Sequence, residues 1–257
     1  MKDIFSHERF SRLKSETRLP YVVCRHKSLI RRRLGDVDMR LQENKAVNLA
    51  LAAPKISGIL IKPGEVFSFW HLVGDTRSKK GYKEGLVISN GKTGKETGGG
   101  MCQLTNLIHW MVLHSNLSIT EHHHHDGFDL FPDFNRQIPF GTGTSIFYNY
   151  LDYRFKNDTK ATYQLYVYIS GEYLCGELRS DRKPAVKYHI NSEAEFFSRE
   201  HDGVYRNGIV KRRCVDIETG NTIFEETIRE NHARVMYDAS GIEISAHHRL
   251  SGQSEVR

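Results

Sequence analysis

The sequence predicts a mixed α/β fold of the α+β class: an antiparallel sheet with the helix that carries Cys102 packed on it, and a β-rich C-terminal extension. Three observations lead to this class. The 257 residues are 39% hydrophobic and 11% aromatic, which is enough for a buried core. Apolar residues recur at three- and four-residue intervals after Cys102, as in an amphipathic helix. They alternate over 162–170 and 173–179, as in strands.

The first ninety residues predict an arm, a helix and three short strands. Residues 1–40 are charged and weakly periodic, so we expect a peripheral arm with a short helix near 29–34. A better helix runs from about 44 to 56, with Gly58 as its stop, and Pro54 should end or distort its last turn. Segments 59–61 and 66–70 read as strands around a turn at 62–65, and 86–89 is a strand that ends at Asn90-Gly91.

The rest of the chain is predicted to be mostly extended. After the Cys102 helix, residues 117–125, 145–155, 162–170 and 173–179 are strand-like, with a hairpin turn at 170–172. From about residue 181 the composition is more charged, and a β-rich extension with a hairpin over 218–221 and a frayed tail from about 239 is expected. The predicted units are therefore an arm at 1–40, a main domain at 41–180 and an extension at 181–257.

The charge balance predicts a partner of negative charge. There are 37 Lys and Arg residues against 31 acidic ones, and the pI is about 9.1. Wall polymers or phospholipid head groups would suit such a surface, the latter through peripheral contact. No basic repeat with interleaved aromatic residues and no zinc-finger spacing indicates nucleic-acid binding. We find no secretory signal and no apolar run near the ~20 residues of a membrane span, so the expected location is the cytoplasm.

No cofactor is expected. The four cysteines are scattered, which indicates neither a disulfide framework nor a paired-cysteine metal or redox site. The glycines at 98–100 are not followed by Gly-Lys-Ser/Thr, so they do not form a nucleotide-binding loop of that type.

Cys102 is the main candidate for chemistry. It follows three glycines at the predicted start of a helix, where the helix dipole and unpaired N–H groups favour a thiolate and lower its pKa. Glycines also let a carbonyl substrate approach the backbone, so we expect Gly99, Gly100 and Gln103 to contact the substrate. The alternative is that Cys102 is a small core residue beneath the turn.

A cysteine nucleophile needs a base, and the run His122-His123-His124-His125 is the best source. His109 lies seven residues along the helix from Cys102, roughly 10 Å at the helical rise. That distance is too long for His109 to accept the thiol proton. Alternation along a strand places His123 and His125 on one face and His122 and His124 on the other. At least one of the two pairs can therefore face the thiol; His125 and His123 are candidate bases, and the spacing alone leaves the other pair open.

Other readings of these residues stay open. Alternate histidines would also suit Zn²⁺ or Ni²⁺, with Asp126 or Asp129, or form a polar surface strand without a catalytic task. Arg136 is a candidate for holding a substrate carboxylate, against the alternative of a surface ion pair. The acid that orients the base is not decided among the following: Glu121, Asp126, Asp129, Asp133 and Asp152.

Five segments together resemble the VanW family, named after an accessory protein of vancomycin-resistance clusters. They are residues 44–49 (NKAVNL), 62–70 (KPGEVFSFW), 81–86 (GYKEGL), 98–106 (GGGMCQLTN) and 152–159 (DYRFKNDT). The segment 121–139 is similar to the family's histidine segment, and by position His125 matches its recurring histidine. The chain departs from the family pattern at His122 and Gly143, where many relatives carry Arg and Asp.

The resemblance implies a bacterial protein of the cell envelope, linked to peptidoglycan and the glycopeptide response. It further implies L,D-transpeptidase-like acyl transfer on peptidoglycan stem peptides or precursors. Cys102 would be the nucleophile and His125 the proton relay, and backbone N–H groups near Cys102 would hold the oxyanion. Two alternatives remain: a non-catalytic accessory that binds wall precursors or partner proteins, and a metal-dependent hydrolase built on the histidines.

Overall fold

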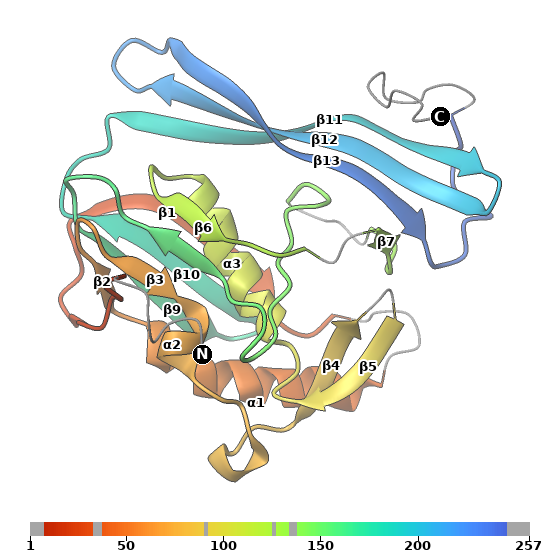
Figure 1. Ribbon diagram of the computed structural model, residues 1–257, viewed down its shortest axis with the longest axis horizontal. Coiled ribbons are helices and arrows are strands. Elements are labelled where there is room, and N and C mark those ends of the chain that lie inside the picture. Colours follow the sequence, from red (N-terminus) through yellow and green to blue (C-terminus); the bar gives the residue numbers. More distant parts are fainter. Residues whose placement is uncertain (1–7, 33–37, 90–91, 125–126, 134–137, 246–257) are drawn as a thin grey trace.

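The computed structural model describes residues 8–32, 38–89, 92–124, 127–133 and 138–245. It confirms the α+β class (Figure 1). The main sheet has the order β1-β10-β9-β2, and every neighbouring pair is antiparallel. Its strands are β1 (Tyr21–Leu29), β2 (Ile59–Ile61), β9 (Tyr163–Ser170) and β10 (Tyr173–Ser180). The hairpin between β9 and β10 forms as expected, with Gly171 at a φ of 55°.

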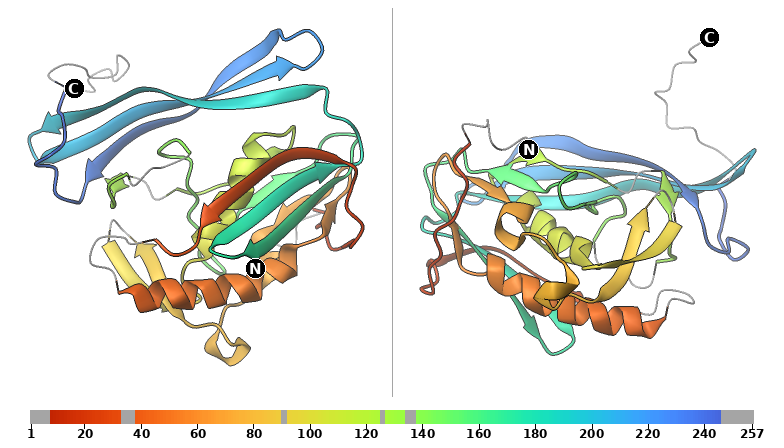
Figure 2. Two further views of the ribbon diagram at one scale, coloured as in Figure 1. Left: turned by 180° about the vertical axis from the view of Figure 1, so that it is seen from behind. Right: turned by 60° about the horizontal axis from the view of Figure 1, so that its bottom comes forward.

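Strand β1 lies in the segment where we expected a peripheral arm. It pairs with β10 along its whole length (Figure 2). Its weak alternation has a physical cause, because the register shifts between Val22 and Cys24 and moves the later side chains to the opposite face. The short helix expected near 29–34 is wrong in its described part, since Leu29 ends the strand and residues 30–32 are irregular. The rest of that segment lies outside the described residues.

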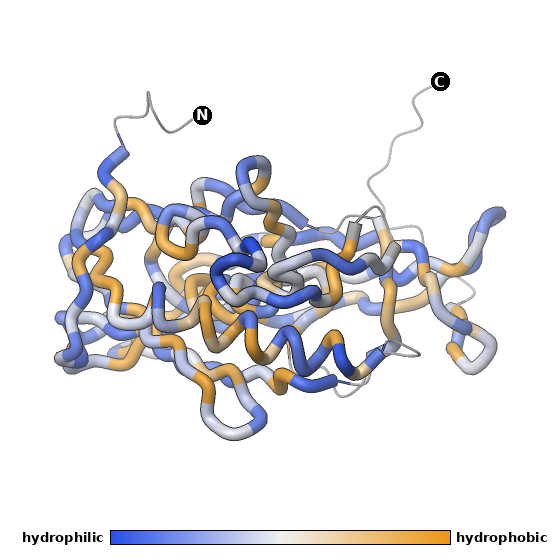
Figure 3. The backbone as a smooth tube through the Cα atoms, turned by 90° about the horizontal axis from the view of Figure 1, so that it is seen from below, coloured by the Kyte–Doolittle hydropathy of each residue, from blue (hydrophilic) through white to orange (hydrophobic). Residues whose placement is uncertain are grey.

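Two helices pack with this sheet and form the core. Helix α3 (Met101–Leu113) contacts β1 and β10, and its apolar stripe is buried, as predicted: Leu104, Leu107, Ile108, Met111 and Val112. A Cβ at Gly176 of β10 would lie 2.6 Å from Cε of Met111, so this glycine lets the helix approach the sheet closely. Helix α1 (Met39–Ile56) packs against β9 and carries polar and apolar residues in alternation, as Figure 3 shows.

Helix α1 starts earlier than its apolar pattern predicts. It begins at Met39 because Asp38 accepts a hydrogen bond from the backbone N–H of Arg40 and caps the helix. Pro54 lies in the last turn and does not end the helix, which continues to Ile56; Gly58 follows with a φ of 84°. No helix within the described residues is both long and apolar enough to cross a membrane.

Two smaller sheets lie beside the helices. One has the order β3-β8-β6, from β3 (Val66–Ser68), β8 (Arg154–Lys156) and β6 (Ser118–Glu121). The other is the hairpin of β4 (Glu84–Ser89) and β5 (Lys92–Thr97). The expected strand 66–70 stops at Ser68, whose hydroxyl accepts from the N–H of His71 and begins α2 (Phe69–Val73). A 3₁₀ turn, η2 (Ser78–Lys80), connects α2 to β4.

The expected strand 145–155 is wrong for most of its length. Only its last two residues enter β8. Before them, Asn149 has a φ of 68° and Phe147 bonds back to Leu151, so the chain turns instead of extending. The alternation of aromatic residues over this segment therefore does not mark a strand.

The C-terminal extension is β-rich, as expected. Its strands β11 (Val186–Glu200), β12 (Gly203–Asp216) and β13 (Thr222–Val235) form an antiparallel meander that extends across the molecule (Figures 1 and 2). The short strand β7 (Phe128–Asp129) adds to β13 in parallel. Asp216 accepts the N–H groups of Glu218 and Thr219 and closes the predicted hairpin.

Candidate functional site around Cys102

Cys102 lies in the first turn of α3, where the sequence places it. Gly100, the N-cap residue, has a φ of 92°, which favours glycine. The thiol is free and half-buried. Burial raises the pKa of the Cys102 thiol, and backbone hydrogen bonds from Ile146 and Cys102 itself lower it by less, so the net shift is upward. The expected low pKa is therefore wrong, because burial of the thiol outweighs the two backbone hydrogen bonds.

The glycines beside Cys102 are required by packing. A Cβ at Gly99 would lie 2.4 Å from the carbonyl of Gly85 in β4, and one at Gly100 would lie 2.3 Å from Cγ of Lys45 in α1. The side chain of Gln103 donates to Ser28 Oγ and to the carbonyl of Leu29 at the end of β1, both at 2.9 Å. Contact of these three positions with a substrate stays a prediction.

The segment 143–146 is held against the first two turns of α3 by polar contacts. Asn106 Oδ1 accepts the N–H and the hydroxyl of Thr144 at 2.6 and 2.8 Å, and the hydroxyls of Thr105 and Thr144 are also bonded. Thr105 and Thr144 are 0 and 1% exposed. Sequence reasoning missed this network, since the pairs are 38 and 39 residues apart and carry no local signal.

The histidines divide between two faces, in keeping with alternation along the segment. The rings of His122 and His124 lie 4.0 Å apart, and His122 lies 4.1 Å from His109 of α3. His109 is buried and its Nδ1 lies 3.0 Å from the hydroxyl of Tyr153. Burial, followed by the charges of His122 and His124, keeps the pKa of His109 well below its usual value. His109 is therefore neutral at pH 7.

His122 contacts the glycine-containing segment 141–143. Its Nε2 lies 3.1 Å from the carbonyl oxygen of Gly143.

His123 lies against an acid. Its Nε2 lies 3.1 Å from Glu121 Oε1, which also accepts the N–H of Asp152 at 2.9 Å. Glu121 is thus the one of the five candidate acids that contacts His123 among the residues described. His125 and Arg136 lie outside the described residues, so their predicted roles have no structural description.

The histidines form no evident metal centre in the described part of the chain. No group of three or more His, Cys, Asp or Glu residues is arranged there to hold an ion. The predicted ligands His125 and Asp126 fall outside it.

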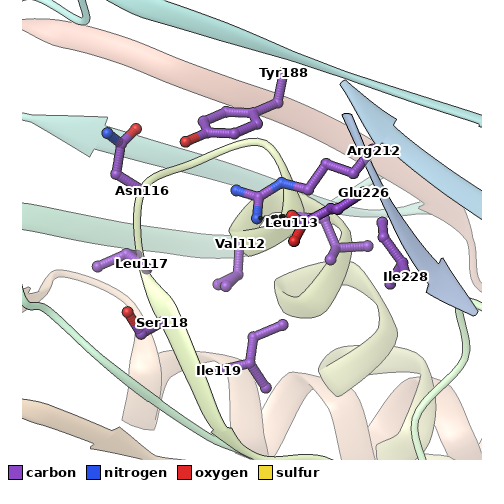
Figure 4. Close-up of a pocket in the computed structure, with 10 residues that line it drawn as sticks. All are labelled: Val112, Leu113, Asn116, Leu117, Ser118, Ile119, Tyr188, Arg212, Glu226 and Ile228. Carbon is purple, nitrogen blue, oxygen red and sulfur yellow. Dashed lines mark hydrogen bonds and ion pairs between the residues drawn. The ribbon is translucent and has the colours of Figure 1, made fainter. Parts of the chain in front are cut away.

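A cavity of about 450 Å³ lies at the opposite end of α3 (Figure 4). Apolar side chains from α3, β6 and β13 line it, with the ion pair of Arg212 and Glu226 at its centre. Val112 in its lining is ten residues from Cys102, roughly 15 Å along the helix axis. None of the residues predicted from the sequence lines this cavity.

Comparison with known proteins adds evidence of a different kind. The family model described as VanW like protein matches residues 44–179. Vancomycin B-type resistance protein VanW of Enterococcus faecalis is 36% identical over 222 residues, which cover 86% of this chain and 80% of that protein. Uncharacterized protein YoaR of Bacillus subtilis is 28% identical over 118 residues, 45% of this chain and 36% of that one. No solved structure matches the chain.

Proposed function

This chain belongs to the VanW family, which is linked to vancomycin resistance, and we propose that it carries out cysteine-dependent acyl transfer on peptidoglycan stem peptides or their precursors. The cell envelope is the place of action in this proposal. The observation that carries it is the position of Cys102: a free thiol in the first turn of α3, within hydrogen-bond reach of backbone amides.

The proposed reaction has two transfers. An imidazole accepts the thiol proton as the sulfur attacks the amide carbonyl after the third residue of the stem peptide. The amide C–N bond breaks, the leaving amine takes the proton, and a thioester remains on Cys102. The amine of a second stem then attacks the thioester carbonyl, and the thiol reforms. In this proposal the amide of Ile146, which bonds to the thiol, stabilises negative charge on the sulfur.

The base in this proposal is one of the histidines of the segment 122–125. His125 retains that role from the family resemblance. In the described part of the chain, His122 and His124 are the members that lie on the α3 side, through the ring of His109. His123, paired with Glu121, has the geometry of an oriented base on the other face.

A second candidate is a non-catalytic accessory that binds wall precursors. The raised pKa of Cys102 favours it, because a protonated and half-buried thiol is a poor nucleophile. No arrangement in the described part of the chain supports a metal-dependent hydrolase.

Intact-mass analysis of the reduced protein with a stem tetrapeptide separates the two candidates. We expect a thioester adduct that is lost in Cys102→Ala and kept in Cys175→Ala, a variant of another half-buried thiol. Without peptide, iodoacetamide should label Cys102 slowly at pH 7, and the rate should rise about tenfold per pH unit toward its raised pKa. Absence of adduct and product in a folded, reduced sample would favour the accessory.

A further inference from the structure

The inward face of α1 carries three polar residues where a core would be apolar. Gln42, Lys45 and Asn48 follow one another at three-residue spacing and are 1, 8 and 0% exposed. Asn48 is fully bonded: its Nδ2 donates to the carbonyls of Gly99 and Lys83, and its Oδ1 accepts the N–H of Lys83. Asn48 is buried because these hydrogen bonds hold the turn that contains Gly99. The burial of the other two is not explained in this way.

The Lys45 residue is 8% exposed, and no residue in the described part of the chain pairs with its amine. Its alkyl stem lies against Gly100, the N-cap of α3, and within the described residues it has neither a hydrogen bond nor an ion pair. Lysine is almost never buried unless it is paired. Burial, followed by the charges of Arg32 and Arg31, lowers the pKa of Lys45 to about 7. Among the described residues, the charged groups that shift the pKa of this amine are therefore both positive.

Two buried amide atoms in the same corner also lack hydrogen-bond partners among the described residues. Gln42 Oε1 accepts the N–H of Arg32 at 3.4 Å, but its Nε2 bonds to nothing. Gln103 uses its Nε2 on β1, and its Oε1 is left unpaired. Leaving such groups unsatisfied is costly, and native proteins have few of them. The corner thus presents one amide donor, one amine and one acceptor beside the N-terminal end of a helix.

We propose that this corner, formed by Gln42, Lys45, Gly100 and Gln103, binds the C-terminal residue of a peptide. The carboxylate is placed at Lys45 and Gln42 Nε2, where the N-terminal end of α3 also favours negative charge. The N–H of that residue is placed at Gln103 Oε1. The unpaired acceptor is the reason to choose a peptide terminus over a phosphate, since a fully ionised phosphate offers it no donor. Arg32 is exposed and Gln103 half-buried, which gives the corner a solvent-facing side.

The identification of that peptide as a peptidoglycan stem rests on the proposed function, because Gly100 and Gln103 flank Cys102. A terminal carboxylate held there would fix one end of a peptide beside the thiol. Lys45 is in this reading a binding residue, without a part in bond making.

Calorimetry with acetyl-D-alanyl-D-alanine and its C-terminal amide tests the proposal. The free acid should bind wild type at least tenfold more tightly than the amide does. Lys45→Met keeps the stem over Gly100 and should weaken binding of the acid at least tenfold. Lys55→Met is the matched control, since Lys55 lies on the same helix but donates to the carbonyl of Val73; it should bind as wild type does. Circular dichroism checks that each variant folds.

A second readout follows the amine itself. In NMR titration of the Lys45 Nζ or Cε, bound acid should move the Lys45 pKa upward, because the carboxylate supplies the missing negative partner. Equal binding of acid and amide, or unchanged affinity in Lys45→Met, overturns the proposal. Failure of the catalytic proposal looks different: the acid binds wild type and Cys102→Ala equally, and no thioester forms.

Discussion

A basic side chain lies at each end of helix α3, and in the described part of the chain only one of the two has a polar partner. At the C-terminal end, Arg212 of β12 donates to the carbonyl of Ser115, forms an ion pair with Glu226 at 3.0 Å and stacks 3.9 Å above the ring of Tyr188. At the N-terminal end, Lys45 lies against Gly100, and no described residue pairs with its amine. The helix dipole favours a cation at the first place and disfavours one at the second.

This difference separates a charged side chain that stabilises the fold from one that is expected to bind a ligand. Arg212 donates to a carbonyl beyond the helix that has no partner within it, and it connects the C-terminal sheet to the main domain. These contacts offset the free-energy cost of burying its charge. The burial of Lys45 is opposed by desolvation, by like charges and by the dipole. A side chain whose burial is opposed by all three of these effects is expected to bind a ligand.

The largest expected effect is a gain of stability in Lys45→Met. At pH 7 we expect about 2 to 4 kcal/mol, because methionine keeps the stem and removes the amine that burial penalises. The folded pKa near 7 lies below the unfolded value near 10.5, so the unfolded chain binds more protons between them and wild-type stability rises with pH across that window. The gap between variant and wild type should therefore close by up to ~1.4 kcal/mol per pH unit.

Urea unfolding at pH 7, 8.5 and 10 measures this gap. Lys55→Met, which removes a bonded lysine, should show no gain. A Lys45→Met variant that is less stable than wild type at pH 7 would break the comparison, because Lys45 would then be paired in solution.

Arg212→Ala is expected to lose stability. The variant removes a charged hydrogen bond to Ser115 and the stacking on Tyr188, at a cost of about 1.5 to 3 kcal/mol. Arg213, the next residue, is exposed and serves as the control; Arg213→Ala should change unfolding by less than about 0.5 kcal/mol. If the two alanine variants unfold alike, the C-terminal end of α3 is not held by Arg212.

The smallest effect is expected from Glu226→Gln. The Glu226 side chain is 49% exposed, so its pair with Arg212 is screened and contributes about 0.5 kcal/mol or less. Thermal unfolding in low and high salt checks this, since the difference from wild type should shrink as salt rises. A loss as large as that of Arg212→Ala would show that the ion pair, and not the bond to Ser115, anchors the sheet.

Elements with a regular local pattern could be predicted from the sequence. The Cys102 helix and the β9–β10 hairpin follow from apolar spacing and a glycine turn within a few residues of each other. The family was also predictable, because its segments are linear motifs. In the site, the position of Cys102 at a helix start and the two faces of the histidine segment were local properties too.

Elements that depend on distant partners were not predictable. Strand β1 is extended because β10, about 150 residues later, supplies its hydrogen bonds. The polar face of α1 gave one usable signal, the three-residue spacing of Gln42, Lys45 and Asn48 on the side that also carries Leu49. In sequence, however, such residues read as an ordinary solvated face.

The family, the α+β class and the position of Cys102 at the start of a helix could all be predicted from the sequence, because each depends on residues close together in the chain. The folded structure was needed to show that burial raises the pKa of the Cys102 thiol, that His123 contacts Glu121, and that Lys45 is buried with no acid beside it among the described residues. These are matters of burial and charge. They depend on which distant segments exclude water from a group, and that is known only when the chain has folded.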